Sequence, residues 1–481
     1  MHAEAPPPNG PATETSTAIH SGMPPLTQPL APPLPPTPIS WRLAIAVCIV
    51  AIAGVAYLTQ PLIGTRGQAL AGIVFFFGLV AMFSTNLRSV NWQTIGWGVG
   101  LQLVLAVLVL KIDPVYEGFK TVGNGVKHFI SFSDAGASFV FGNLADAKPP
   151  EAGGTWSRLF PTGYVFQFAF VALPPILFVS AFFTVLYHFG ILQWCVRQLA
   201  RVMVHLMGTS GAETLSVSAN VFMGQTEAPL IVKPYVPRMT NSELFALMAS
   251  GMAHISGGMM VVYINYGADP VAVLTTCVMA CPCSLYLSKL FLPETGVPET
   301  GGKLHSEYSK SPYVNAIDAA ATGTTDGLRL ALNVAAMLVV FIAFVAMFDA
   351  ILGLIDPALS LRKIFGWMFS PAAFLMGVDP QDVEQVGRLL GTKLAMNEHV
   401  AYLDMKSLKA ADPQFMTDRS LKLTAFALTG FANFASVGIQ LGGIGAMAPE
   451  RRHDLARLGG RALFVGFTAT LLNAAIAGLL L

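Results

Sequence analysis

The segment Asn220-Val-Phe-Met-Gly-Gln-Thr-Glu-Ala-Pro-Leu230 sets the interpretation of the whole chain, because it places helix breakers and polar groups inside a strongly apolar sequence. Gly224 and Pro229 both interrupt helices, and backbone freed at membrane depth persists only where it is buried in protein or lines a watery cavity. The polar side chains are Asn220, Gln225, Thr226 and Glu227. Because an ionisable group is costly at that depth, Glu227 is a functional candidate. The segment therefore predicts a small polar ligand site at the tip of a broken or re-entrant helix.

A second segment, Asn397-Glu398-His399-Val-Ala-Tyr402, has the same character in the other half of the chain, with a carboxylate beside an amide. Two polar tips in the two halves of a membrane chain are typical of a transporter that is built from repeats. We therefore expect the substrate site to lie between the two tips.

The composition is that of an integral membrane protein. The chain has 481 residues, of which 54% are hydrophobic and 11% charged, whereas globular chains carry about 25% charged residues. Its formal net charge of +1 argues against a nucleic-acid partner. The five cysteines give no disulfide framework. Cys281-Pro-Cys283 is better explained by small apolar packing than by soft-metal transport, since no P-loop motif is present to power a pump.

Charge-free apolar runs predict about nine transmembrane helices, since about 20 apolar residues cross a bilayer. The runs are 43–65, 67–87, 89–110, 163–189, 244–266, 270–288, 330–348, 423–441 and 462–481. The mixed stretch 112–160 predicts an interfacial helix and loop, and the apolar stretch 364–378 is too short to cross. Regions 190–242 and 383–415 surround the two polar tips and predict re-entrant hairpins. The expected fold class is therefore an all-α integral membrane protein with two re-entrant helical hairpins.

The beginning of the chain, residues 1–40, is rich in proline and poor in large apolar side chains. This composition predicts a disordered tail, and the position of the first apolar run does not suit a signal peptide. Lysines and arginines near the ends of the spans favour a cytoplasmic N-terminus, with a moderate bias. Nine spans would then place the C-terminus on the outer side.

Motifs in a fixed order across residues 70–481 resemble those of a known family, the concentrative nucleoside transporters. They are Val90-Asn-Trp92, Phe139-Val-Phe-Gly142, Phe168-Ala-Phe170 with Leu173-Pro174, Thr209-Ser-Gly-Ala-Glu213, Gly224-Gln-Thr-Glu-Ala-Pro-Leu230, Ser242-Glu243, Met376-Gly-Val378, Asn397-Glu398 with Val400-Ala-Tyr402, Gly430-Phe-Ala-Asn-Phe434 and Pro449-Glu-Arg-Arg452. Any one tripeptide is a weak signal, but the long string at the first tip together with the others is a strong one.

The resemblance implies a homotrimer, with a scaffold and a mobile transport domain of two inverted hairpin-plus-broken-helix repeats in each protomer. It implies symport of purine or pyrimidine nucleosides, driven by a sodium or proton gradient, across a bacterial inner membrane. The expected layout is a cytoplasmic tail (1–40), N-terminal scaffold helices (41–111), an interfacial or periplasmic segment (112–160), a scaffold helix with the first transport repeat (161–300, tip 220–230), a cytoplasmic loop (301–328), a scaffold helix with the second repeat (329–458, tip 397–402) and a C-terminal transmembrane helix (459–481).

The same resemblance implies which side chains would bind the substrate. The base contacts carry over onto Gln225, Thr226, Glu227 and Met259, and the ribose contacts onto Glu398, Asn433 and Ser436, with Phe431 nearby. The chemistry of these residues agrees, because a buried carboxylate accepts strong hydrogen bonds from two hydroxyls. An amide both donates and accepts, as a nucleobase requires. Asn433 and Ser436 are three residues apart, so we expect both on one helix face.

The family's sodium site carries over onto Asn220 and onto backbone near Met223 and Ile255, but His254 stands where a serine or threonine is expected. Hard cations prefer oxygen ligands, and histidine titrates near physiological pH. His254 is therefore either a proton-coupling group or a tolerated core histidine, unless Ser256 is the true counterpart. His399 stands where the family usually has phenylalanine. It either tunes Glu398, contacts the substrate or shares a proton, or it lies at a wet hairpin edge.

Three function classes remain after these observations. Secondary active transport is favoured, and a passive or gated nucleoside channel would differ from it by showing no uphill accumulation. A membrane sensor would bind without uptake, but a sensor needs no repeated pair of tips and broken helices. An enzyme is not expected, because no nucleophile–base pair or metal set accompanies Glu227 and Glu398.

Overall fold

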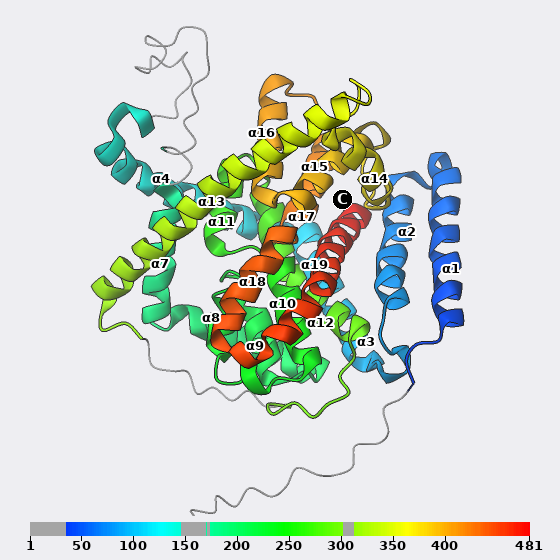
Figure 1. Cartoon of the computed structure of the whole chain (residues 1–481), viewed down its shortest axis with the longest axis horizontal. Helices are drawn as coiled ribbons and strands as arrows, with labels where there is room; N and C mark the ends of the chain where they lie inside the picture. The colour runs from blue at the N-terminus through cyan, green and yellow to red at the C-terminus, as the bar shows by residue number, and fades with distance from the viewer. Residues whose placement is uncertain (1–34, 146–169, 171–173, 302–311) are drawn as a thin grey trace, which may run out of the picture. The chain divides into compact units, whose positions relative to one another are not determined.

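The computed structural model describes residues 35–145, 170, 174–301 and 312–481, and the regular elements in these ranges are helices (Figure 1). The expected disordered tail falls almost entirely outside the described residues, and so does the beginning of the expected span 163–189. The all-α fold class is confirmed for the described part of the chain.

Three apolar helices open the described chain: α1 (Ile39–Leu58), α2 (Gln60–Met82) and α3 (Trp92–Lys111). The first two pack against each other, and α1 exposes most of its large hydrophobic side chains. The predicted boundary between the spans 43–65 and 67–87 was wrong, because the first helix ends at Leu58. The backbone then bends again at Gly64, whose φ of 63° is open to glycine. Neither break carries a charge, so charge-free runs could not locate them.

The next helices are α4 (Asp113–Phe141), α7 (Pro174–His188) and α8 (Ile191–Met207). The axes of α7 and α8 differ by 73°. The bend lies at Gly190, where φ is 76°. A helix was predicted within 112–160, and α4 lies there.

A long helix, α13 (Ala316–Gly353), packs along α7 and crosses the view in Figure 1. It begins inside the segment 301–328 that was predicted to be a loop, and that prediction was wrong for residues 316–328. The Asn315 side chain caps the helix by accepting hydrogen bonds from the backbone of Ile317 and Asp318. Charges in the first turns hid this start from a search for apolar runs.

Two similar sets of elements form the rest of the molecule. The first set is α9 (Gly211–Ala219), the 3-10 turns η4 (Ala228–Val232) and η5 (Val236–Arg238), α10 (Asn241–Ala253), α11 (Gly257–Asn265) and α12 (Pro270–Phe291). The second set is α14 (Leu361–Leu375), η6 (Pro380–Asp382), α15 (Val383–Ala395), α16 (Glu398–Ala411), α17 (Asp418–Leu428), α18 (Phe434–Met447), η7 (Pro449–Arg451) and α19 (Arg452–Leu480).

Each set contains a helix that is broken in the middle, and the breaks have the same spacing. In the first set Thr240 caps α10 and Ser256 caps α11, and in the second Thr417 caps α17 and Asn433 caps α18. The two caps are sixteen residues apart in both pairs (240 to 256 and 417 to 433). Each of the predicted spans 244–266 and 423–441 therefore consists of two half-helices, which meet at an unwound segment.

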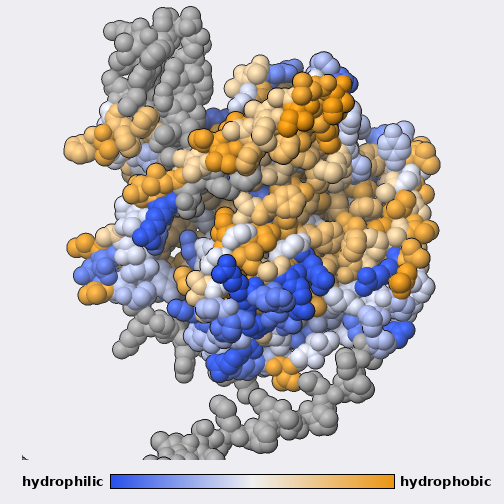
Figure 2. Space-filling model, viewed as in Figure 1, coloured by the Kyte–Doolittle hydropathy of each residue, from blue (hydrophilic) through white to orange (hydrophobic). Residues whose placement is uncertain are grey.

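Six helices among the described residues are long and apolar enough to cross a membrane, and the bent pair α7 and α8 raises the number to seven. The six correspond to the predicted runs that begin at residues 43, 67, 89, 244, 270 and 462. The broken helix α10–α11, α12 and α19 are mostly buried and pack together as the core. Hydrophobic side chains cover the face over α1, α2 and α13, and hydrophilic side chains gather near the start of α19 (Figure 2).

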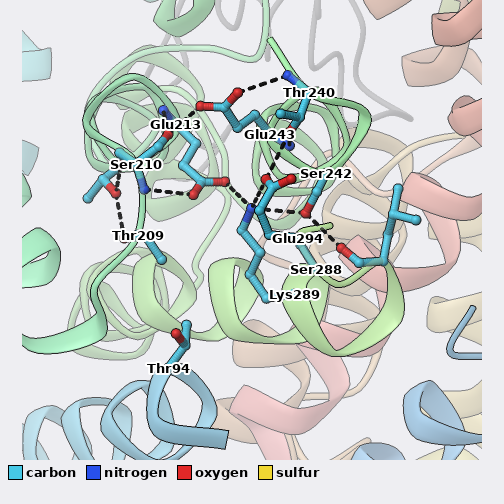
Figure 3. A network of polar contacts seen from close by, with 12 residues as sticks. Thr94, Thr209, Ser210, Glu213, Thr240, Ser242, Glu243, Ser288, Lys289 and Glu294 are labelled. Atoms are coloured by element: carbon cyan, nitrogen blue, oxygen red, sulfur yellow. Dashed lines mark hydrogen bonds and ion pairs between the residues drawn. The ribbon is translucent and has the colours of Figure 1, made fainter. Parts of the chain in front are cut away.

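A buried polar cluster joins the beginning of α9, the beginning of α10 and the end of α12 (Figure 3). Glu213 and Glu243 each complete a capping box, with Ser210 and Thr240 as the capping residues. The Ser210 hydroxyl also donates to Glu243 Oε1 at 2.5 Å. Two residues at opposite ends of the segment 210–243 therefore lie in one cluster, so the first hairpin begins and ends at the same place.

Lys289 occupies the middle of this cluster. Its Nζ lies 2.7 Å from Glu213 Oε2 and 3.3 Å from Glu294 Oε2. It also donates to the Ser242 hydroxyl at 2.9 Å. Both Lys289 and Glu213 are buried. The cluster is built from reciprocal caps and ion pairs at the base of the hairpin, which agrees with a structural role for Glu213 and Glu243.

Candidate substrate and cation site

The hairpin tip of the first repeat and the two helix breaks are joined by backbone hydrogen bonds. Gly257 N–H, at the start of α11, donates to Phe222 C=O in the first tip at 2.9 Å. Phe431 N–H, in the break between α17 and α18, donates to His254 C=O in the other break at 3.0 Å. The unwound segments therefore satisfy each other's backbone groups inside the protein, as a helix break at membrane depth requires.

Glu398 lies at the centre of the polar site. It opens α16 immediately after Asn397, whose side chain caps that helix by accepting from Val400 N–H. The carboxylate is buried and accepts two hydrogen bonds, from Tyr263 O–H at 2.8 Å and from Asn433 Nδ2 at 2.9 Å. Its two oxygens are thus held by α11 and by the start of α18, so the carboxylate has a fixed orientation.

Asn433 connects this carboxylate to the first tip. As the capping residue of α18, it accepts from Ser436 N–H at 2.9 Å while its amide donates to Glu398. The Ser436 hydroxyl in turn accepts from Gln225 Nε2 at 3.1 Å. Gln225 Oε1 accepts from Gln440 Nε2 at 3.1 Å. A continuous buried network therefore runs from the second hairpin tip to the first.

The other predicted substrate residues lie around this network in different ways. Thr226 packs against Gly443 of α18, and Met259 is buried at the start of α11. Phe431 is half-buried in the second break. Glu227 is exposed and accepts from Gly224 N–H at 3.0 Å, which closes the tip locally. Among the described residues, no hydrogen bond joins Glu227 to the Glu398 network.

The predicted cation residues lie where the first tip meets the end of α10. Asn220 Nδ2 donates to the Ser250 hydroxyl at 3.1 Å, while Asn220 Oδ1 is buried without a hydrogen-bond partner in the described part of the chain. His254 is buried, and its Nδ1 lies 2.9 Å from Ser250 C=O. Met223 and Ile255 are also buried there. An unpartnered amide oxygen beside a half-helix end suits a hard cation.

His399 does not lie at a wet hairpin edge, and that expectation was wrong. Its side chain is 2% exposed. Its Nε2 is 3.2 Å from Tyr266 Oη, and the two rings meet edge to face with centroids 5.3 Å apart. The aromatic side chains of α11 cover this face of α16, which no pattern within the segment 397–402 indicates. The His399 ring therefore packs against Tyr266 and near Tyr263, the residue that also holds Glu398.

Two polar residues of the network were not predicted from the sequence: Tyr263 and Gln440. Tyr263 follows Met259 by four residues on α11, and Gln440 follows Ser436 by four on α18. Residues four apart share a helix face. That spacing could have extended the predicted site by one turn on each half-helix.

Taken together, this arrangement defines a class of protein: a membrane transporter with paired hairpins and broken helices around a central polar site. Family models agree with the class. The N-terminal model of Na+ dependent nucleoside transporters matches residues 71–144, a nucleoside recognition model matches 169–269, and the C-terminal model of Na+ dependent nucleoside transporters matches 272–478.

Individual proteins point the same way. The chain is 38% identical to sodium/nucleoside cotransporter 1 of Homo sapiens over 428 residues, which covers 86% of this chain but 63% of that protein. It is 36% identical to an uncharacterized transporter of Haemophilus influenzae, with 86% of this chain and 97% of the relative covered. Its fold matches CNTnw in an inward-facing substrate-bound state with a TM-score of 0.78 and 34% identity, covering 86% and 97% of the two chains. The chain belongs to the concentrative nucleoside transporter family.

Proposed function

We propose that the protein is a symporter that imports nucleosides across the plasma membrane with a cation gradient. The observation that carries this proposal is the buried Glu398 carboxylate, which shares one hydrogen-bond network with Gln225 of the opposite hairpin tip. The chain spans less than two thirds of the length of its mammalian relatives. The sodium/nucleoside cotransport named for those relatives supports the proposal.

In this function the network residues exchange their internal hydrogen bonds for bonds to the substrate. The ribose hydroxyls donate to Glu398, which is already fixed by Tyr263 and Asn433. The base takes both a donor and an acceptor from Gln225, whose amide now bonds Ser436 and Gln440. The N-terminal ends of α11 and α18 add partial positive charge near the polar groups of the substrate. This set of contacts favours a sugar with free hydroxyls.

Transport follows from movement of the two repeats against the remaining helices. The hairpins of α9 and of α15–α16 would be re-entrant, entering and leaving the bilayer on one side, so the site stays enclosed while the repeats move. The exposed apolar surface of α1 would face lipid. The further assignments are a homotrimer, a cytoplasmic N-terminus and a periplasmic C-terminus in a bacterial inner membrane, all of which rest on likeness to the family.

Sodium is the cation that fits the residues at the end of α10. Asn220 Oδ1 is a buried acceptor without a partner among the described residues, and Met223 and Ile255, whose backbone would complete the site, are buried as well. A bound sodium ion would supply positive charge that offsets the carbonyls at this half-helix end. His254 then serves as a packing residue, because its Nδ1 is already held by Ser250 C=O.

Uptake by proteoliposomes tests the function and its cation. Labelled uridine and adenosine are supplied with a sodium gradient or with a proton gradient, each imposed separately. We expect uphill accumulation with sodium, and we expect Asn220→Ala to abolish that sodium dependence while His254→Ser retains it. Accumulation with protons alone, lost in His254→Ser, would instead make His254 the coupling residue. Binding without uphill accumulation under either gradient would favour a channel or a sensor.

The ribose contacts give a prediction about substrate choice. We expect 2′,3′-dideoxyuridine to be transported at least about 100-fold less efficiently than uridine, because a site built to bond hydroxyls is left with unpaired polar groups when they are missing. Competition for labelled uridine uptake measures the ratio. Equal inhibition by the two nucleosides would contradict the assignment of Glu398 and Asn433 to the ribose.

A further inference from the structure

Lys393 is a fully buried cation in the second repeat that the proposed substrate contacts do not use. It lies on α15, and its Nζ donates to Ala427 C=O at 2.7 Å and to Thr470 Oγ1 at 3.0 Å. It also lies 5.2 Å from the ring centre of Phe467. An ammonium has three donors, of which these two hydrogen bonds use two, while the aromatic ring lies close to the charge. Of the ion pairs among the described residues, none includes Lys393.

The strongest acceptor of Lys393 is the end of a half-helix. Ala427 lies in the last turn of α17, which ends at Leu428 before the break. The last carbonyls of a helix lack partners within the helix and carry a partial negative charge. In transporters built from repeats, such half-helix ends coordinate the coupling cation. The ammonium of Lys393 thus lies where an inorganic cation could bind.

The spacing of the two repeats shows which place in the first repeat corresponds to this one. Aligning Thr240 with Thr417 also aligns the second caps, Ser256 and Asn433. Ser250 then corresponds to Ala427, since each follows its threonine by ten residues.

In the first repeat, Ser250 contacts the proposed cation residue Asn220. Its backbone carbonyl lies 2.9 Å from His254 Nδ1, and its hydroxyl accepts from Asn220. The end of the half-helix therefore borders the proposed cation residue Asn220 in the first repeat, and it accepts from a lysine ammonium in the second. Helices α15, α17 and α19, which enclose the lysine, pack together in the second repeat (Figure 1).

We propose that the Lys393 ammonium is a resident cation, that is, a permanent part of the protein. In the second repeat it occupies the place that the transported cation takes in the first repeat. This inference rests on the proposed function and deepens it, because it explains why a protein with two similar repeats would need one exchangeable cation. The ammonium holds the end of α17, and the break that follows leads directly to Asn433 and the ribose contacts. It also interacts electrostatically with Glu398, five residues farther along the same hairpin.

Chemical rescue of nucleoside binding tests this role. Lys393→Ala leaves a space that matches propylammonium, and Lys393→Met fills it with an uncharged side chain. We expect both variants to bind uridine at least about tenfold more weakly, which is the loss expected when a hydrogen bond from a buried charge is removed. Propylammonium should restore binding by Lys393→Ala but not by Lys393→Met. Tetramethylammonium at equal ionic strength, which has no N–H donor, should restore neither.

Controls separate this inference from the proposed function. Lys409→Met changes an exposed lysine on the other arm of the same hairpin and should bind uridine normally. Lys393→Arg keeps a charged donor and should bind better than Lys393→Met. If the wild-type protein binds no nucleoside, the proposed function fails; if Lys393→Met binds as well as wild type, only the resident cation fails. If Lys393→Ala does not fold alone, propylammonium should raise its folded yield in detergent, and an equal yield with tetramethylammonium would overturn the proposal.

Discussion

Glu398→Gln is expected to lower the efficiency of uridine uptake by at least about 100-fold, since hydrogen bonds to a buried charged group each contribute about 1.5–3 kcal/mol. The carboxylate accepts from both Tyr263 and Asn433. A glutamine can still accept from Asn433 through its oxygen, but its amide nitrogen then faces Tyr263, whose hydroxyl must turn from donating to accepting. The variant loses the negative charge that would attract two ribose hydroxyls. Initial rates of labelled uridine uptake in proteoliposomes measure the effect.

A control for this variant lies in the same hairpin. Glu384 is exposed on α15, and Glu384→Gln removes the same charge without touching the network. It should transport uridine at the wild-type rate. Near-normal uptake by Glu398→Gln would show that the carboxylate does not bind the ribose. A similar loss in both variants would point to a general effect of charge on this hairpin.

Lys289→Met is expected to destabilise the fold by about 3–5 kcal/mol, the usual cost of removing one partner of a buried ion pair. The change leaves Glu213 buried without its partner at 2.7 Å, and it also removes the contacts to Glu294 and Ser242. These residues join the base of the first hairpin to α10 and α12 (Figure 3). Thermal unfolding of the purified protein in detergent, followed by loss of its monodisperse peak, should occur at a clearly lower temperature.

Two further variants test the electrostatic origin of this loss. Glu213→Gln combined with Lys289→Met removes both charges, so the double variant should be more stable than the sum of the single changes predicts. Lys120→Met breaks an exposed pair with Glu117, where the side chains are 53% and 60% exposed. Exposed pairs contribute about 0–1 kcal/mol, so this change should hardly alter unfolding. An unfolding temperature of Lys289→Met equal to that of Lys120→Met would exclude a stabilising role for the cluster.

The organisation into repeats could be predicted because helix breakers and capping residues, which act locally, mark it in the sequence. Gly224 and Pro229 interrupt one hairpin, and Asn397 caps the other after its tip. Capping boxes mark where α9 and α10 begin, since the serine or threonine is followed three residues later by glutamate. These devices act within one turn of helix, so a single sequence reveals them.

The remaining parts of the site depend on which helix faces meet. Tyr263, Gln440 and Lys393 lie on helices whose buried faces are set by partners far away in the chain. A wet hairpin edge was one of the positions considered for His399, yet the aromatic side chains at α11 bury it. The start of α13 was missed for a related reason: its first turns carry charges and are stabilised by a cap, not by apolar runs.

The hydrogen bond from Phe431 N–H to His254 C=O joins the two helix breaks directly, and one break borders the proposed cation residues while the other borders the proposed ribose residues. A shift of either break is therefore transmitted through the backbone. For two ligands that meet at such a junction, thermodynamic reciprocity holds: the factor by which the cation tightens nucleoside binding equals the factor by which the nucleoside tightens cation binding. Where that factor exceeds one, an ion that binds alone is held more loosely than an ion that binds together with the nucleoside.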